Sequence, residues 1–291
     1  MSDQLKGMLI TLMGVLFVVP DSLFVRLIEA DALVVSFWRN LISGGIILVW
    51  LLIVSGLGPF RAVLGTGIYG VFYMISAGGA GILFVLAVSL TSVANVVLII
   101  ASMPVFAAFY SWVFLGERIS RRMVLTMAAV AAGLAVIAFG SGESENAHWS
   151  GDLLALSVAA LFAAGLTVAR KVRHVSMVPG AALGYVLASL ALLPFIAPMD
   201  VPDGQWGLVG LHGGFIVLSV VGLALGPRYI PSAEVGLLIL LESVLAPLLV
   251  WFAVGERPGF YALIGGCVVI GALAASNWIA LRSRKPKTLQ V

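Results

Sequence analysis

The sequence predicts an all-α integral membrane protein whose ten transmembrane helices form two inverted five-helix repeats. Three observations lead to this fold class: an apolar composition, a series of helix-length apolar segments, and a stretch that recurs at a constant offset. Hydrophobic residues make up 62% of the chain and charged residues only 10%, with a mean hydropathy of +1.15. A soluble chain of 291 residues cannot bury that much apolar surface, so the protein belongs in a bilayer.

Ten apolar segments are each long enough to cross a bilayer as a helix. Short connections that carry glycine, proline or charged residues separate them, and no soluble domain fits between them. The single cysteine, Cys267, lies in an apolar run, which excludes a disulfide framework and a cysteine metal site. The expected spans are roughly 5–28, 32–54, 63–88, 92–115, 123–141, 152–170, 178–198, 206–226, 231–253 and 260–281.

One stretch of the sequence occurs twice. Thr91–Arg118 and Ile230–Arg257 match at an offset of 139 residues, so that Trp112 corresponds to Trp251 and each copy ends in Gly-Glu-Arg. A constant offset over so many positions indicates an internal duplication. We therefore expect a first five-helix repeat in residues 1–145 and a second one in residues 146–291.

The basic residues predict how the chain is oriented in the membrane. With the N-terminus in the cytoplasm, thirteen of the sixteen lysines and arginines lie in cytoplasmic loops or at the termini, as the positive-inside rule requires. Both termini are then cytoplasmic. Because each repeat holds five spans, the second repeat enters from the opposite side, and the duplication is an inverted one.

Inverted repeats are typical of secondary transporters, because two similar halves can pack in two ways and expose one site to either side in turn. A duplication that serves only as a scaffold is the alternative. Channels and intramembrane hydrolases are other classes to consider. No serine here has the sequence context of a hydrolase nucleophile, and His212 is the one histidine that could partner one. No phosphate-binding loop suggests the use of ATP.

Two opposite charges are expected at similar depth near the outer side. Asp21 lies about seven residues inside the end of the first span, and Arg39 lies about seven residues inside the start of the second. We expect them to form an ion pair or to share a polar cavity wall, because an unpaired charge in a bilayer costs about 2.5–3.5 kcal/mol. The pair can pin the two spans or bind substrate. Pro20 is expected to kink the first span beside Asp21.

Acidic residues distinguish the second copy of the repeat from the first. Glu242 stands where the first copy has Met103, and Glu234 stands where it has Asn95. All four are expected to face the interface between the repeats, with Pro104 and Pro247 interrupting the two helices nearby. A carboxyl group in mid-membrane can carry a proton or can be a hydrogen-bonded structural acid. For Glu234 we favour an ion pair with Arg228.

The remaining candidates for the transport pathway are one histidine and several aromatic rings. His212 lies about six residues into the eighth span, where it can be a packed hydrogen-bonding residue or a proton relay. Tyr73, Phe106 and Phe162 can wall a cavity for an apolar or aromatic metabolite, or can simply pack helices together.

The two copies of the repeat end in Leu115-Gly-Glu-Arg118 and Val254-Gly-Glu-Arg257, and further motifs stand at Phe37-Trp38-Arg39, Thr91-Ser-Val-Ala-Asn95 and Arg228-Tyr-Ile-Pro-Ser-Ala-Glu234. In these motifs the chain resembles the drug/metabolite transporter superfamily, in its EamA-type branch. This resemblance implies ten helices in two inverted halves around a cavity lined by spans 1, 3, 4, 6, 8 and 9. It also implies export of small metabolites, with amino-acid exporters, including the aromatic type, prominent among the members. The first span departs from many members, which have a tryptophan where this chain has Val-Pro-Asp.

The sequence thus predicts a non-enzymatic secondary transporter of the bacterial inner membrane that exports amino acids or related small metabolites by alternating access. A uniporter or channel-like facilitator and a carrier of nucleotide-type metabolites remain alternatives. The expected partners are a small-molecule substrate and the lipid bilayer, with no nucleic acid, no cofactor and no metal. A homodimer is left open.

Overall fold

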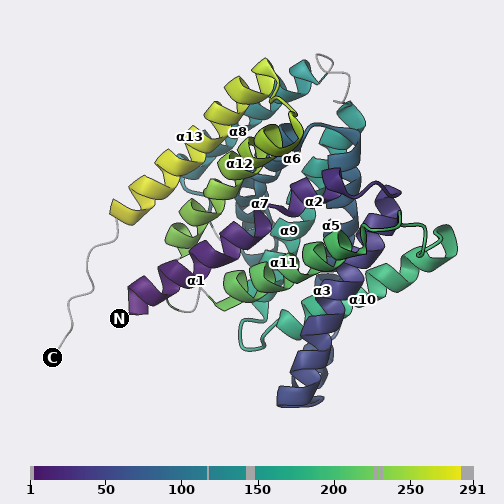
Figure 1. The fold of residues 1–291 in the computed structure, drawn as a ribbon. Helices are drawn as coiled ribbons and strands as arrows, with labels where there is room; N and C mark the ends of the chain where they lie inside the picture. Colours follow the sequence, from purple (N-terminus) through teal and green to yellow (C-terminus); the bar gives the residue numbers. More distant parts are fainter. Residues whose placement is uncertain (1–2, 117, 142–147, 226–228, 230–231, 283–291) are drawn as a thin grey trace.

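The computed structural model describes residues 3–116, 118–141, 148–225, 229 and 232–282, and their regular structure is helical. Figure 1 shows the helices packed side by side as a bundle. Their bounds are α1 Asp3–Val18, α2 Asp21–Leu27, α3 Ala32–Ser55, α4 Gly58–Gly65, α5 Ile68–Leu90, α6 Val93–Ile100, α7 Met103–Leu115, α8 Arg121–Gly140, α9 Trp149–Lys171, α10 Val178–Leu192, the 3-10 turn η1 Leu193–Phe195, α11 Trp206–Leu225, α12 Ser232–Val254 and α13 Phe260–Arg282.

The predicted membrane spans are present as helices. Within the described residues, nine helical stretches are long and apolar enough to cross a bilayer, and α12 supplies a tenth apolar segment at Leu238–Val254. This confirms an all-α integral membrane fold. The third span starts later than predicted, because residues 58–65 form the separate helix α4 and Gly67, with φ of 63°, turns the chain into α5. The start of α1 and the end of α13 lie on the same side of the bundle (Figure 1).

Two spans are broken where proline was expected to break them, and one is not. The first span divides at Pro20 into α1 and α2, and the fourth divides before Pro104 into α6 and α7. The prediction for Pro247 is wrong, since α12 runs through it as one helix. Proline removes a backbone hydrogen bond and crowds the preceding turn, but the buried neighbours Ala246 and Val250 pack this part of α12 against the core.

The packing of the helices follows the two-repeat relationship. In the two repeats α1 corresponds to α9, α3 to α10 and α5 to α11. The contact between α5 and α9 therefore has its counterpart in the contact between α11 and α1, and the contact between α5 and α10 has its counterpart in that between α11 and α3. The fourth span, α6 with α7, corresponds to α12, so the contact of α7 with α9 likewise has its counterpart in the contact of α12 with α1. The contacts α3–α10, α8–α13 and α6–α12 map onto themselves and therefore lie on the approximate two-fold axis. The two inverted halves thus interlock rather than standing as separate domains.

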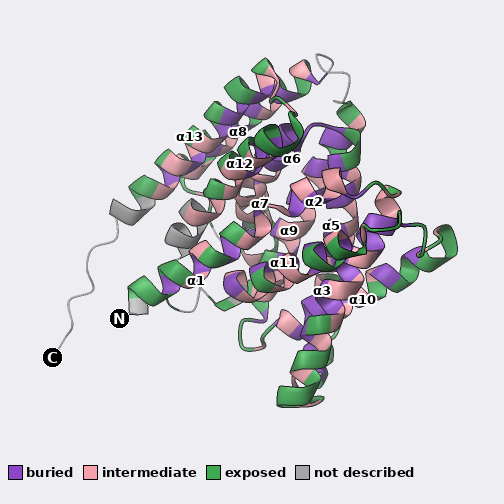
Figure 2. Cartoon of the chain, viewed as in Figure 1, coloured by how far each residue is buried: buried purple, intermediate pink, exposed green. Residues whose placement is uncertain are grey.

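The largest buried cluster lies where the two halves meet. It is built mainly from α5 and α6, with contributions from α2, α3, α8, α9, α11, α12 and α13. Figure 2 shows buried positions gathered toward the centre of the bundle and exposed positions at the far end of α3. Apolar residues such as Ile53 and Phe252 are 79% and 94% exposed, as expected for a surface that lipid covers.

Below, the predicted outer end is the end of the bundle at which α2 finishes and α3 begins, and the predicted cytoplasmic end is the opposite one.

Candidate functional site

A buried ion pair forms the centre of the candidate site. Asp21 is the first residue of α2, directly after the break at Pro20, and its side chain points into the bundle with only 2% of the residue exposed. Arg39 of α3 donates from Nε to one carboxylate oxygen of Asp21 at 2.9 Å and from Nη2 to the other at 2.5 Å. The pair expected from the matching depths of the two residues is therefore present, with the bidentate geometry that arginine favours.

The second repeat contributes a third member to this pair. His212 of α11 is 1% exposed, and its Nε2 lies 2.6 Å from Oδ1 of Asp21. The imidazole stacks on Phe24 at 5.3 Å, and the guanidinium of Arg39 lies over the ring of Phe84 at 5.4 Å. Asp21 thus joins α2 and α3 of the first repeat to α11 of the second. A movement of one half relative to the other must therefore either break the contact with His212 or move α11 together with α2.

Polar groups beside the ion pair remain without partners in the described part of the chain. Asn40 accepts a hydrogen bond from Nη1 of Arg39 at 3.1 Å, but its own Nδ2 donates to nothing there. The hydroxyls of Ser22 and Ser36 are buried and likewise unpaired. Buried polar groups in proteins are normally hydrogen-bonded, so this region holds unused donors and acceptors.

Glu242 is the unpaired acid of the site. It lies on α12, it is half-buried, and it makes no hydrogen bond to the described residues. It nevertheless lies close enough to Asp21 and Arg39 for all three charges to interact. The adjacent Ser243 donates to the carbonyl of Val97 on α6 at 3.4 Å, which fixes α12 against the fourth span at this level.

Asn95 lies in a different polar cluster, at the predicted outer end. Its Nδ2 donates to the Asp152 carboxylate at 3.1 Å, and Thr91 Oγ1 donates to the same carboxylate at 2.8 Å. Ser141 also donates to Asp152. Sequence reasoning missed Asp152, which stands at the very start of the sixth span. Its position in the first turn of α9 was the available signal.

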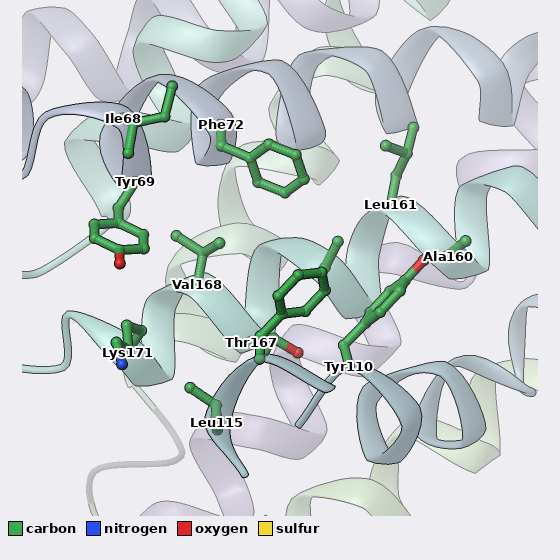
Figure 3. A pocket seen from close by; sticks show the side chains of 12 residues that line it. Ile68, Tyr69, Phe72, Tyr110, Leu115, Ala160, Leu161, Thr167, Val168 and Lys171 are labelled. Carbon is green, nitrogen blue, oxygen red and sulfur yellow. The ribbon is translucent and has the colours of Figure 1, made fainter. Parts of the chain in front are cut away.

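The aromatic residues expected to wall a cavity do not line one cavity found among the described residues. A cavity of about 450 Å³ opens between α5, α7 and α9 near the predicted cytoplasmic end. Its aromatic walls are Tyr69 and Phe72 of α5 with Tyr110 and Phe114 of α7 (Figure 3). Tyr73, one position beyond Phe72 and so about 100° further around α5, packs instead against Gly165 and Gly180.

The other predicted residues have mixed placements. Phe106 lies beside Tyr110 at 6.5 Å between ring centres, and Phe162 packs against the main core cluster. Met103 is half-buried at the start of α7. The side chain of Glu234 and the whole of Arg228 lie outside the described residues, so the pair expected between them is untested.

A model of the EamA-like transporter family matches the chain twice, over residues 5–139 and 149–278. The chain belongs to the EamA-like transporter family. The two matched segments agree with the duplication found in the sequence, while the exact boundary expected at residue 145 stays a prediction. A transporter, and not an enzyme, is therefore the class of this protein, which confirms the resemblance to the drug/metabolite transporter superfamily.

Individual relatives agree with this family assignment. The EamA-like transporter is 27% identical to an uncharacterized transporter of Archaeoglobus fulgidus, covering 87% of this chain and 89% of that protein. It is 25% identical to solute carrier family 35 member G1 of Mus musculus, covering 94% of this chain and 79% of the mouse protein. A solved crystal structure shares the fold with a TM-score of 0.65 at 19% identity, covering 96% of this chain and 99% of that one.

Proposed function

We propose that this EamA-like transporter exports amino acids or related small metabolites across the bacterial inner membrane by alternating access. Both termini are then cytoplasmic, as the distribution of basic residues predicts. The observation that carries the proposal is the buried contact of Asp21 with Arg39 and His212, because it joins the two repeats where unpaired polar groups and Glu242 are also found.

The charges of this cluster suit a zwitterionic substrate. An amino acid carries a carboxylate and an ammonium group, which are the same two charges that Asp21 and Arg39 present to each other. The substrate can therefore compete with the internal pair: its carboxylate takes the guanidinium of Arg39, and its ammonium takes Asp21 or Glu242. Bidentate binding of carboxylate by arginine is among the stronger polar contacts in proteins.

The role proposed for Glu242 is coupling. A carboxyl group inside a membrane that has no fixed partner can exchange a proton or a cationic group as the cavity opens to one side and then the other. In this proposal Glu242 carries that exchange, and Asp21 stays engaged with Arg39 until substrate arrives.

The contacts at the predicted outer end support a conformation closed on that side. Arg26 pairs with Glu256, and the cluster around Asp152 ties α9 to the fourth span beside it. Alternating access requires one end of the pathway to be closed in any single conformation.

The test is counterflow of radiolabelled amino acids in proteoliposomes loaded with the same amino acid. We expect Arg39→Gln and Asp21→Asn to reduce uptake at least about a hundredfold, since each removes a charged contact worth about 3 kcal/mol. Glu242→Gln is expected to preserve exchange but to abolish uptake driven by a pH gradient. Asp200→Asn is the matched control, because Asp200 is exposed and its side chain bonds to none of the described residues.

Two results would overturn parts of this proposal. Counterflow that stays at the wild-type level in Asp21→Asn removes Asp21 from the mechanism, and uptake that still follows the pH gradient in Glu242→Gln removes Glu242 from it. Uptake that ignores the pH gradient in the wild-type protein indicates a uniporter or facilitator, and counterflow with nucleotide-type metabolites in place of amino acids changes the substrate class.

A further inference from the structure

The cavity between α5, α7 and α9 is separate from the Asp21 cluster. Its lining residues come only from those three helices, whereas the Asp21 cluster is built on α2, α3 and α11. The cavity arises because α6 packs with α5 and α9, while α7, beyond the break before Pro104, packs closely on α9 and at most slightly on α5. A groove is left between α5 and α7, with α9 as its floor.

The floor of the groove is made of small side chains at helical spacing. Ala160, Ala164 and Thr167 follow one face of α9, and Lys171 continues the same face at the end of the helix. The walls are the rings of Phe72, Tyr110 and Phe114 together with neighbouring aliphatic side chains (Figure 3). The groove is therefore apolar along its length and polar at one end.

The groove opens onto the surface that lipid covers. Among its wall residues, Ile68 is 73% exposed and Phe114 is 68% exposed, and both are apolar. A side chain of this kind on the outside of a membrane bundle faces acyl chains. A hydrocarbon chain from the bilayer thus reaches the groove laterally, without passing through water or through the bundle.

The polar end of the groove lies where a phospholipid headgroup would be. Lys171 is the last residue of α9 and is exposed, and no hydrogen bond or ion pair joins it to the described residues. The hydroxyl of Tyr69, near the start of α5, lies at the same end of the groove (Figure 3). A lysine and a tyrosine at a helix end are the groups that bind lipid phosphates at membrane interfaces.

We propose that this groove binds one anionic phospholipid of the surrounding bilayer, with an acyl chain on the Ala160–Ala164 floor and the phosphate at Lys171. The headgroup must be anionic overall, because a zwitterionic lipid brings its own cation to compete with Lys171. The site is independent of the transported substrate, since none of its residues belongs to the Asp21 cluster.

The test is mass spectrometry of the intact protein, released from detergent after incubation with phosphatidylglycerol or with phosphatidylcholine of the same acyl chains. We expect wild-type protein to retain one phosphatidylglycerol about fivefold more tightly than phosphatidylcholine, the preference that one basic residue gives at a membrane surface. Lys171→Gln abolishes this preference, and Lys171→Arg keeps it. Ala164→Phe places a ring on the floor of the groove, so the protein should retain one lipid molecule fewer than the wild type with either lipid.

Matched controls separate the groove from general lipid binding. Arg121→Gln removes an exposed basic residue at the start of α8, and Ala128→Phe adds a ring to an exposed position of α8, so neither touches the groove. Both are expected to bind lipid as the wild type does. Every variant is first compared with the wild type by gel filtration and thermal unfolding.

The proposal is wrong if Lys171→Gln keeps the preference for phosphatidylglycerol, or if Ala164→Phe retains as many lipids as Ala128→Phe. A third outcome would reassign the groove: transport that falls in Lys171→Gln while lipid retention stays unchanged shows that an anionic solute, and not a lipid, uses it.

Discussion

Arg26 of α2 and Glu256, in the connection that follows α12, form an ion pair of 2.8 Å across the two repeats. Arg26 also donates from Nη2 to the carbonyl of Thr91 at 2.9 Å. The second carboxylate oxygen of Glu256 accepts the backbone N–H of Val93, in the first turn of α6, at 2.7 Å. One ion pair thus ties the ends of the first, third, fourth and ninth spans together at the predicted outer end. Glu256 belongs to one of the two Gly-Glu-Arg sequences of the repeat.

Breaking this ion pair is expected to expose the predicted outer end. In a Cys267→Ala background, Val93→Cys places a thiol at a position that is 1% exposed. Adding Glu256→Gln should raise its labelling rate by a membrane-impermeant maleimide about tenfold or more. The reason is that a hydrogen bond to a charged group contributes about 1.5–3 kcal/mol, and 1.4 kcal/mol is a tenfold change in population.

The neighbouring residue provides the control for this labelling experiment. Arg257 is exposed, and no ion pair or side-chain hydrogen bond joins it to the described residues, so Arg257→Gln should leave the labelling rate unchanged. Equal labelling in Glu256→Gln and in the unmodified background would show that the ion pair does not hold this end closed.

Separating Asp21 from Arg39 is expected to destabilise the fold. Removing one partner of a buried ion pair leaves the other charge without compensation, at a cost of about 3–5 kcal/mol. Both Asp21→Asn and Arg39→Gln should therefore lower the free energy of unfolding by about this amount. The double variant, which removes both charges, should lose less than the sum of the two single changes. Titration of mixed micelles with dodecyl sulfate, followed by circular dichroism, measures each value.

The exposed acid Asp200 again serves as reference, because Asp200→Asn removes a charge without breaking a side-chain bond to the described residues. Additive losses in the double variant would mean that the two side chains stabilise the protein independently, contrary to the bidentate contact of 2.5 and 2.9 Å.

The features that the sequence predicted correctly depend only on how far a residue lies along its own helix, which can be counted from the sequence. Pro20 and Pro104 break their spans because proline lacks the N–H that a helix interior uses. The pairing of Asp21 with Arg39 followed from depth, since adjacent antiparallel spans bring residues at equal depth close together. The same reasoning was available for His212, which lies six residues from the start of α11 at Trp206. Depth was compared only between neighbouring spans of the first repeat, and not between Asp21 and the residues of the second repeat.

The contacts that could not be predicted depend on how helices are rotated and which of them are neighbours. Asp152 meets Asn95 only because α9 packs on α6, and nothing in either span specifies that neighbour. Tyr73 and Phe72 differ by one position in sequence, yet only Phe72 lines the cavity. Their orientation is decided by the glycines of α9 and α10 against which Tyr73 packs, and not by the pattern within α5.

A final prediction concerns the contact of α8 with α13, which lies on the approximate two-fold axis. A Cβ added at Gly133 would stand 2.8 Å from the carbonyl oxygen of Gly265, and one added at Gly265 would stand 2.5 Å from that of Gly133. The two backbones touch, so neither helix can accept a methyl group without moving. Gly133→Ala should therefore lower the free energy of unfolding by about 1–3 kcal/mol, the usual cost of overpacking.

Gly271 on α13 offers the matched comparison, because a Cβ there meets nothing within 4 Å. Gly271→Ala should be neutral or should stabilise the protein by up to about 1 kcal/mol, since alanine favours the helix over glycine. Dodecyl sulfate titration of the two variants side by side separates packing from helix propensity. If Gly133→Ala is as stable as Gly271→Ala, α8 and α13 are not held at the distance found in this structure, and the contact on the axis is looser than the two glycines indicate.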